Sequence, residues 1–199
     1  VANRTHAKAV TFAAAHSGVT AVEDVTMLSS MCDVVVSAVT ADRDVIELAT
    51  ALAVNAGAGF VLIDTSTIAS SSAIEAAALL QARGADFIDA PVSGGVEGAK
   101  NGKLSVMLGG NADTLERVQA VLDCFAARIT HMGDVGAGQN TKAVNQILVA
   151  GIAQAVTEGL ALGQALGLQA DRLLPTLLAG AAQNWFLDKR GATMLRDEF

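Results

Sequence analysis

The sequence predicts an α/β fold in which a mostly parallel sheet, covered by helices, is followed by an all-helical region. Two observations carry this prediction. Up to about residue 135, short apolar runs alternate with segments of helical periodicity, which is the pattern of βαβ units. After Gly133 only the helical periodicity remains. We therefore predict two domains, residues 1–135 and residues 136–199.

Within the first domain, apolar runs predict the strands, and polar or small residues predict where the helices begin and end. The expected strands cover residues 33–39, 60–64, 86–88, 105–108 and 128–131. The expected helices cover residues 7–16, 24–31, 42–56, 70–83 and 112–125. Start signals stand at Asp24, Asp42 and Ser70, and Gly84 is a stop signal. Because ligands of parallel sheets bind at the carboxyl ends of the strands, polar residues at those ends mark a candidate cleft.

The second domain is predicted to begin with a glycine hinge at residues 136–138 and a helix that runs to about Gly167, followed by helices at 171–178 and 185–195. Between residues 143 and 170 Glu158 is the sole formal charge, so a membrane helix has to be considered. Five amide side chains oppose that interpretation, because polar groups are expensive in lipid: Asn145, Gln146, Gln154, Gln164 and Gln169. We therefore expect a buried core helix and no membrane contact. Small residues at every fourth position suggest a homodimer or homotetramer.

The net charge of −7, without any run of Lys and Arg, excludes a nucleic-acid-binding protein. The two cysteines, Cys32 and Cys124, lie far apart in apolar segments, so we expect buried, reduced thiols and a cytoplasmic protein. His6, His16 and His131 have no spacing typical of a metal site, and no metal is expected.

The segment from Asp89 to Gly95 combines a proline, a hydroxyl and two adjacent glycines after an apolar strand. Gly94 and Gly95 allow backbone amides to point inward and a ligand to approach closely. A carboxylate bound there would receive those amide hydrogen bonds and one from Ser93, and such charge-assisted bonds are strong. A plain tight turn is the alternative, although turns rarely need so many glycines.

Lys142 and Asn145 are three residues apart on a predicted helix, so a cation and a carboxamide share one helix face. We expect Lys142 to lie in the first turn, where the positive helix end disfavours its charge, and burial would lower its pKa further. A lysine whose pKa approaches neutrality can act as a general base. The alternative is a lysine on a solvated face.

Asn3, Arg4 and Thr5 are interpreted as the exit of a strand, where an arginine can accommodate the 2′-phosphate of a dinucleotide. This favours NADP over NAD, and the alternative is a solvated arginine beside a turn. Thr67 follows the strand at 60–64 and is placed either to touch a cofactor or substrate or to cap a helix.

Together these pieces resemble the β-hydroxyacid dehydrogenase family, which includes 3-hydroxyisobutyrate dehydrogenase, tartronate semialdehyde reductase and the glyoxylate/succinic semialdehyde reductases. The resemblance covers essentially the whole chain and occurs in the family's order and spacing. The matching pieces are Asn3-Arg4-Thr5, Asp64-Thr65-Ser66-Thr67, Asp89-Ala90-Pro91-Val92-Ser93-Gly94-Gly95, and Gly136-Ala137-Gly138 leading into Lys142 and Asn145.

The resemblance implies a Rossmann-like dinucleotide-binding domain and a helical substrate and dimerisation domain. It implies an oxidoreductase that transfers a hydride between NADP(H), with NAD as the other possibility, and a short β-hydroxy acid or its semialdehyde. It assigns catalysis to Lys142 and Asn145. Substrate contacts go to Ser93, Gly94, Gly95, Trp185 and Phe186, and cofactor contacts to Asn3, Arg4, Thr5, Val39, Thr40 and Thr67.

The family's first strand with its glycine-rich phosphate turn, and its later lysine-aspartate helix, have no counterpart between residues 1 and 199. We therefore expect this chain to be part of a longer protein or a truncated product. Two other functions stay open. One is a non-catalytic nucleotide-binding or scaffold module, and the other is an imine reductase relative, although both would have little need of Lys142.

Overall fold

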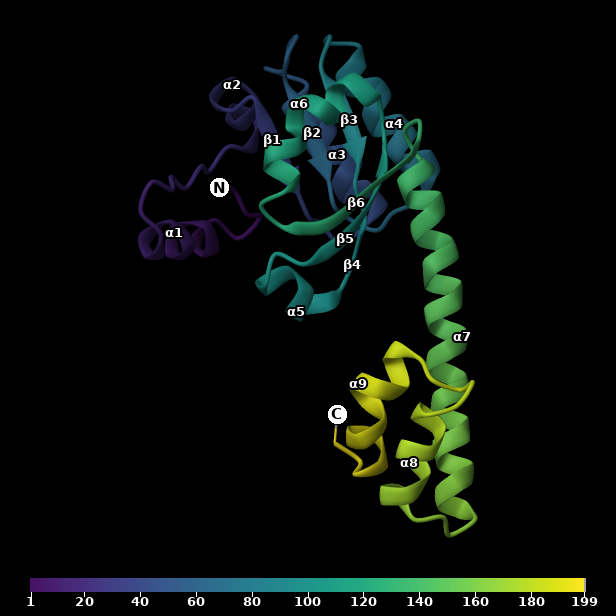
Figure 1. Cartoon of the computed structure of the whole chain (residues 1–199). Coiled ribbons are helices and arrows are strands. Elements are labelled where there is room, and N and C mark those ends of the chain that lie inside the picture. Colours follow the sequence, from purple (N-terminus) through teal and green to yellow (C-terminus); the bar gives the residue numbers. More distant parts are fainter. Residues whose placement is uncertain (199) are drawn as a thin grey trace. The chain divides into compact units, whose positions relative to one another are not determined.

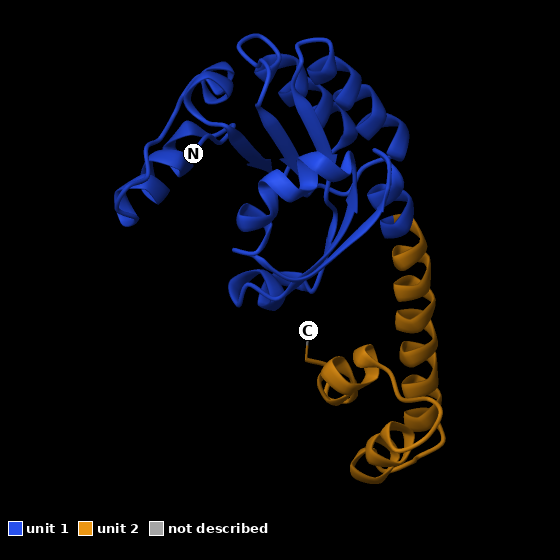
Figure 2. Ribbon diagram, turned by 45° about the horizontal axis from the view of Figure 1, so that its top comes forward, with its two compact units in different colours: residues 1–142 blue, residues 143–199 orange. Residues whose placement is uncertain are grey.

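The computed structural model describes residues 1–198, which divide into two compact units, residues 1–142 and the described residues from Ala143 onward (Figure 2). The division by compactness falls after Lys142, seven residues beyond the domain boundary that we placed after residue 135. That earlier boundary stays a prediction. Each unit is described separately below.

The first unit alternates helices and strands as expected, which confirms the α/β class (Figure 1). Its strands are β1 (Val34–Ser37), β2 (Val61–Asp64), β3 (Asp86–Asp89), β4 (Val92–Ser93), β5 (Leu104–Gly109) and β6 (Ala126–Gly133). Its helical elements are α1 (His6–Ala15), η1 (Val25–Met27), α2 (Leu28–Met31), α3 (Asp42–Leu52), α4 (Ser70–Gln81), α5 (Gly95–Lys100) and α6 (Ala112–Leu122). The helix α7 (Ala137–Ala165) begins in this unit and continues into the second.

The sheet is mixed. β1, β2 and β3 are parallel and in register, so Ser37, Asp64 and Asp89 end neighbouring strands at the same level. β5 is antiparallel to both β3 and β4, and β6 lies parallel beside β5. The sequence predicted β1, β2, β3, β5 and β6, but neither β4 nor the reversal at β5.

Residues 89–93 behave as one strand that is interrupted at Pro91. The antiparallel register that pairs Asp89 with Gly109 continues unchanged as Val92 with Val106 and Ser93 with Ser105. Between them the amide of Met107 donates to the carbonyl oxygen of Pro91 at 3.1 Å. Proline has no N–H to return, and so the ladder is broken at this residue. The segment predicted as a glycine-rich loop is therefore a short strand followed by α5.

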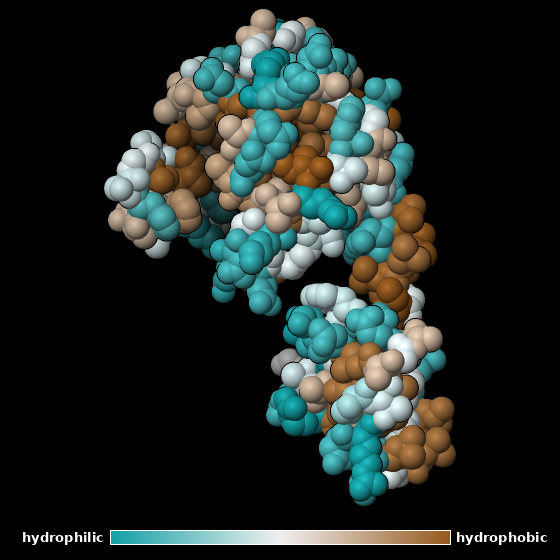
Figure 3. Space-filling view, viewed as in Figure 1, coloured by the Kyte–Doolittle hydropathy of each residue, from teal (hydrophilic) through white to brown (hydrophobic). Residues whose placement is uncertain are grey.

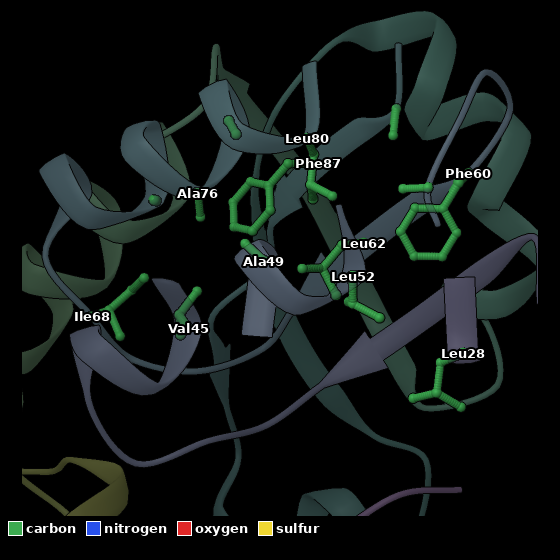
Figure 4. Close-up of a cluster of buried hydrophobic side chains, with 14 residues drawn as sticks. Leu28, Val45, Ala49, Leu52, Phe60, Leu62, Ile68, Ala76, Leu80 and Phe87 are labelled. Atoms are coloured by element: carbon green, nitrogen blue, oxygen red, sulfur yellow. The ribbon is translucent and has the colours of Figure 1, made fainter. Parts of the chain in front are cut away.

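Side-chain alternation along the strands divides the core into two layers. Leu62 and Phe87 point to one face of the sheet, where they pack with α3 and α4 (Figure 4). Val61, Ile63 and Ile88 point to the other face, where they pack with α6 and β5. Two covered faces explain why these strands are apolar throughout rather than alternating.

Of the predicted start and stop signals, Asp24 and Gly84 operate at helix ends, whereas Ser70 and Asp42 are the first residues of α4 and α3 and neither is the N-cap. Asp24 accepts a hydrogen bond from the amide of Thr26 at 2.9 Å and so caps η1. Gly84 ends α4 with φ +74°, a conformation that favours glycine. Asp42 lies inside α3 rather than at its cap, and its carboxylate accepts from the amide of Ala69 at 2.8 Å.

In the second unit, the rest of α7 packs against α8 (Ala170–Leu178) and α9 (Trp185–Leu195). The bounds of α8 and α9 agree with the predicted helices at 171–178 and 185–195 to within one residue. The core there contains Val156, Leu160 and Leu187. The interpretation of α7 as a buried core helix is wrong for the described residues. Val144, Ile147 and Leu148 are exposed on it, because α8 and α9 pack against a later part of the helix. Figure 3 shows hydrophobic surface along this part of α7. By length and composition alone α7 could span a membrane, a weak signal, and its most apolar stretch is mostly exposed.

The expected burial of the cysteines is also wrong. Cys32 and Cys124 are both exposed and unbridged. Each lies just after the last turn of a helix, α2 or α6, where the chain turns at the surface.

Candidate active site

A network of hydrogen bonds joins the carboxyl ends of β1 and β2. The hydroxyls of Ser37 and Ser66 both donate to Oδ1 of Asp64, at 2.6 and 2.7 Å. The hydroxyl of Ser66 also accepts from the amide of Val39, at 2.9 Å. Asp64 is fully buried, so the network fixes the loops that follow both strands from beneath.

Asp89 ties the end of β3 to the beginning of α7. Its Oδ1 accepts from the amide of Gly136 at 2.8 Å, and its Oδ2 accepts from the amide of Gln139 at 2.9 Å. Both amides are donors that a helix start leaves unsatisfied, and a buried carboxylate satisfies them here. Gly109 and Gly138 make room for it, since a Cβ on either would overlap Asp89.

The first turn of α7 is held a second time by the side chain of Gln139, which is buried. Its Nε2 donates to the carbonyl oxygen of Ser66 at 2.8 Å, and its Oε1 accepts from the amide of Ile68 at 3.2 Å. The hinge that we predicted at residues 136–138 is therefore wrong in one respect: Gly138 is a helical residue in a tightly packed turn.

Lys142 is buried, with 8% of its surface exposed, and its Nζ donates to the carbonyl oxygen of Val92 at 2.9 Å. Burial lowers the pKa of Lys142 below 10.5 because the charged form loses solvation. The expected location in the first turn is wrong. α7 begins at Ala137, so Lys142 lies in the second turn, and burial rather than the helix end accounts for its pKa.

Burial also raises the pKa of both carboxyls above 3.8. For Asp64 the hydroxyl hydrogen bonds from Ser37 and Ser66 oppose the rise, and Oδ2 has no partner within the described residues. For Asp89 the amides of Gly136 and Gln139 oppose it. The carboxyl ends of β2 and β3 thus hold two desolvated carboxyls.

The structure brings Lys142 to the predicted carboxylate-binding segment, because Val92 directly precedes Ser93. Ser93 is half-buried in β4, whereas Gly94 and Gly95 are exposed at the start of α5. Their φ angles are +136° and +62°, conformations that side chains rarely adopt. The lone hydroxyl, the two glycine amides and the lysine therefore share one region.

The remaining predicted residues lie in several places. Val39 is half-buried, while Thr40 and Thr67 are exposed just past β1 and β2. Asn3, Arg4 and Thr5 are exposed, precede α1 and belong to no strand, contrary to our interpretation of this segment. Asn145, Trp185 and Phe186 belong to the second unit, where Asn145 donates to Gln146 and Trp185 is exposed at the start of α9.

Sequence reasoning missed the structural roles of Asp64, Asp89 and Gln139. An aspartate as the last residue of an apolar strand was an available signal for the first two, since a buried carboxylate must find donors. Among the residues that the structure describes, no group of three His, Cys, Asp or Glu side chains could hold a metal ion.

Two family models match the chain. Residues 1–133 match the NAD binding domain of 6-phosphogluconate dehydrogenase. Residues 136–199 match the NAD-binding region of NADP-dependent 3-hydroxyisobutyrate dehydrogenase. The chain belongs to the β-hydroxyacid dehydrogenase family. The family predicted from the sequence motifs is thereby confirmed.

An uncharacterized oxidoreductase of Synechocystis is 34% identical over 99% of this chain and 69% of its own length. The structure of 3-hydroxyisobutyrate dehydrogenase from Mycobacterium tuberculosis with L-serine gives a TM-score of 0.83 at 31% identity, over 94% of this chain and 64% of that one. The structure of Psf3 in complex with NADP+ and 2-OPP gives a TM-score of 0.88 at 25% identity, over 99% of this chain and 70% of that one.

Solved imine reductases share the fold at 14–21% identity, and this likeness concerns the fold alone. The chain spans 42–69% of the length of the curated relatives that it matches.

Proposed function

We propose that the protein carrying this chain is an NADP-dependent oxidoreductase of short β-hydroxy acids or the corresponding semialdehydes, with Lys142 as general acid and base. The observation that carries the proposal is the buried ammonium of Lys142, held 2.9 Å from the carbonyl oxygen of the residue before Ser93. A desolvated lysine with a lowered pKa, beside a segment able to bind a carboxylate, has the equipment for deprotonating a hydroxy acid.

The substrate carboxylate would accept hydrogen bonds from the hydroxyl of Ser93 and from the amides of Gly94 and Gly95. This contact would leave the hydroxyl group near Lys142. The neutral Nζ would then accept the hydroxyl proton as the carbon–hydrogen bond breaks, and in the reductive direction the ammonium would return it to the carbonyl oxygen. On the family motif we assign Asn145, one turn further along α7, as the neighbour that orients the reacting oxygen.

The cofactor-side residues fit a dinucleotide. Thr40 and Thr67 are exposed polar groups just past two parallel strands, and a buried network fixes the backbone beneath them. Arg4 is an exposed cation that could pair with a 2′-phosphate, beside Asn3 and Thr5. The nicotinamide, when bound, supplies the hydride acceptor. The support for NADP over NAD comes from Arg4, the NADP-dependent family model and the NADP+ bound in a relative.

The test is an assay at the nicotinamide absorbance band with three- and four-carbon hydroxy acids and semialdehydes, on the protein that carries this chain. General acid–base assistance contributes roughly 10²–10⁴-fold, so Lys142→Met should lower kcat by about that factor while the fold persists. Lys103→Met, which changes an exposed lysine, should leave kcat unchanged. Near-wild-type turnover in Lys142→Met would refute the assignment.

We also propose that the protein associates with further copies of itself. The exposed apolar residues along α7 in the second unit favour a homodimer or homotetramer. Analytical ultracentrifugation of the same protein at several concentrations would measure the mass of the oligomer.

A further inference from the structure

We propose that Gln139 is a positioning residue, which holds Thr67 and Lys142 in one fixed arrangement. This inference rests on the proposed function, which gives those two residues their roles. It concerns contacts made entirely within the first unit.

The side chain of Gln139 forms hydrogen bonds with the residues on both sides of Thr67. Its Nε2 donates to the carbonyl oxygen of Ser66, and its Oε1 accepts from the amide of Ile68. Thr67 lies between these two residues, and it is exposed while both neighbours are buried. The side-chain amide of Gln139 thus fixes the backbone on both sides of the exposed hydroxyl without touching that hydroxyl.

The same residue fixes the lysine. The backbone amide of Gln139 donates to the buried carboxylate of Asp89, and Lys142 follows three residues later on the same helix face. Lys142 itself reaches Val92, which follows Asp89 by three residues. A shift of Gln139 would therefore move the lysine relative to both the cofactor-side loop and the carboxylate segment.

A purely structural glutamine at this position would be replaceable by a side chain of similar volume with a loss of stability alone. A positioning glutamine must also change the chemistry, because an error of about 1 Å in placement can cost roughly 10²-fold in rate. The two roles can be separated by measuring the turnover of correctly folded protein.

The first experiment compares Gln139→Met with Asn140→Met in the protein that carries this chain. Asn140 is the next residue of α7 and is exposed, so it is a matched control. We expect Gln139→Met to lower kcat by about tenfold to a hundredfold, with little change in the KM of the hydroxy acid, and Asn140→Met to change neither. A Gln139→Met variant with a lower melting temperature and an unchanged kcat per folded molecule would overturn the proposal.

Gln139→Glu covers the case in which the methionine variant does not fold. A protonated carboxyl offers one donor and one acceptor, as the amide does, whereas the ionised form has no donor for Ser66. Turnover relative to wild type should therefore approach unity at low pH and fall at least about tenfold as the introduced carboxyl ionises. Asp64, Asp89 and Lys142 also titrate around this position, so wild type is measured at each pH. A ratio that stays constant with pH contradicts the proposal.

A third measurement does not depend on the reaction. In the 199-residue chain with ¹³C-methylated lysines, NMR reports the titration of Lys142, assigned by its loss in Lys142→Met. We expect Gln139→Met to move this pKa upward toward 10.5, because the loosened turn admits water. An unchanged titration overturns the positioning role, whatever the activity. A shifted titration in a protein that turns over no hydroxy acid supports the positioning of Lys142 by Gln139 and refutes the proposed function.

Discussion

The ammonium of Lys142 donates to the carbonyl oxygen of Val92 across fifty residues of sequence, at a distance of 2.9 Å. This bond connects the second turn of α7 to residues 89–93, which pair with β5. A single carbonyl oxygen replaces only part of the solvation that the ammonium loses, and so its pKa is lowered.

The stability of the first unit should therefore depend on the protonation of Lys142. Because its folded pKa lies below the unfolded value of 10.5, the unfolded chain binds the proton more tightly, and stability rises with pH between the two values. Lys142→Met should remove this rise and be at least as stable as wild type at neutral pH. Urea unfolding at several pH values measures the free energy of unfolding, with Lys103→Met as control. A slope of stability against pH that is unaltered in Lys142→Met would contradict this prediction.

Removing the carboxylate of Asp89 should destabilise the fold strongly. Asp89→Ala leaves the amides of Gly136 and Gln139 buried without an acceptor, and each such donor costs about 1–3 kcal/mol, so we expect a loss of about 2–6 kcal/mol. Asp89→Asn keeps one acceptor and should lose about half as much. Chemical denaturation gives these values, and Asp113→Asn, at an exposed helix position, should change stability by less than about 1 kcal/mol.

Asp64 should make stability fall as pH rises from the acid range. Its folded pKa is raised above 3.8, so the unfolded chain loses the proton first and deprotonation favours unfolding until pH exceeds the folded pKa. In Asp64→Asn the oxygen can still accept from Ser37 and Ser66, but no charge forms. The stability of the variant relative to wild type should therefore increase as pH rises above 3.8 and level off once pH exceeds the folded pKa. Thermal melts across this range that show a constant difference would rule out this assignment.

Two glycines of α7 should respond oppositely to alanine. A Cβ at Gly138 would collide with the carbonyl oxygens of Met107 and Asp89, so we expect Gly138→Ala to lose about 1–3 kcal/mol. A Cβ at Gly151 meets nothing within 4 Å, so Gly151→Ala should gain about 0.5–1 kcal/mol from helix propensity. Chemical denaturation of both variants tests this pair, and equal effects would show that the packing around Gly138 can relax.

If Arg4 recognises a 2′-phosphate, Arg4→Ser should weaken NADP binding while leaving NAD binding nearly unchanged. A hydrogen bond to a charged group contributes about 1.5–3 kcal/mol, which corresponds to about a 10- to 100-fold change in the ratio of the two kcat/KM values. The control is Arg43→Ser, an exposed arginine that contacts Asp44. Equal losses with both cofactors would remove Arg4 from the site.

The sequence predicted most elements because apolar strands and capped helices are local features. Asp24, Gly84 and the strand at β2 illustrate this, since neighbouring residues decide their conformations. The family motifs also predicted that Lys142 belongs with Ser93, and the two segments do meet.

What failed depended on long-range partners. The reversal of β5 follows from pairing with residues 89–93, and no local pattern encodes a partner. The exposure of α7 follows from which residues pack against it rather than from its own apolar composition. Gln139 looks like an ordinary polar helix residue until Ser66 and Ile68, more than seventy residues away, are placed beside it.

The interrupted strand at residues 89–93 also fixes the number of residues between Asp89 and Val92. The carboxylate of Asp89 accepts from the amide of Gln139, and the carbonyl oxygen of Val92 accepts from Nζ of Lys142. The three-residue spacing on the strand therefore has to suit the three-residue spacing on the helix together with the reach of the lysine side chain. Inserting or deleting one residue here would move Val92 by about 3.3 Å and reverse the direction of its side chain. We therefore expect this spacing to be invariant among relatives that keep the lysine, even where the residues that fill it differ.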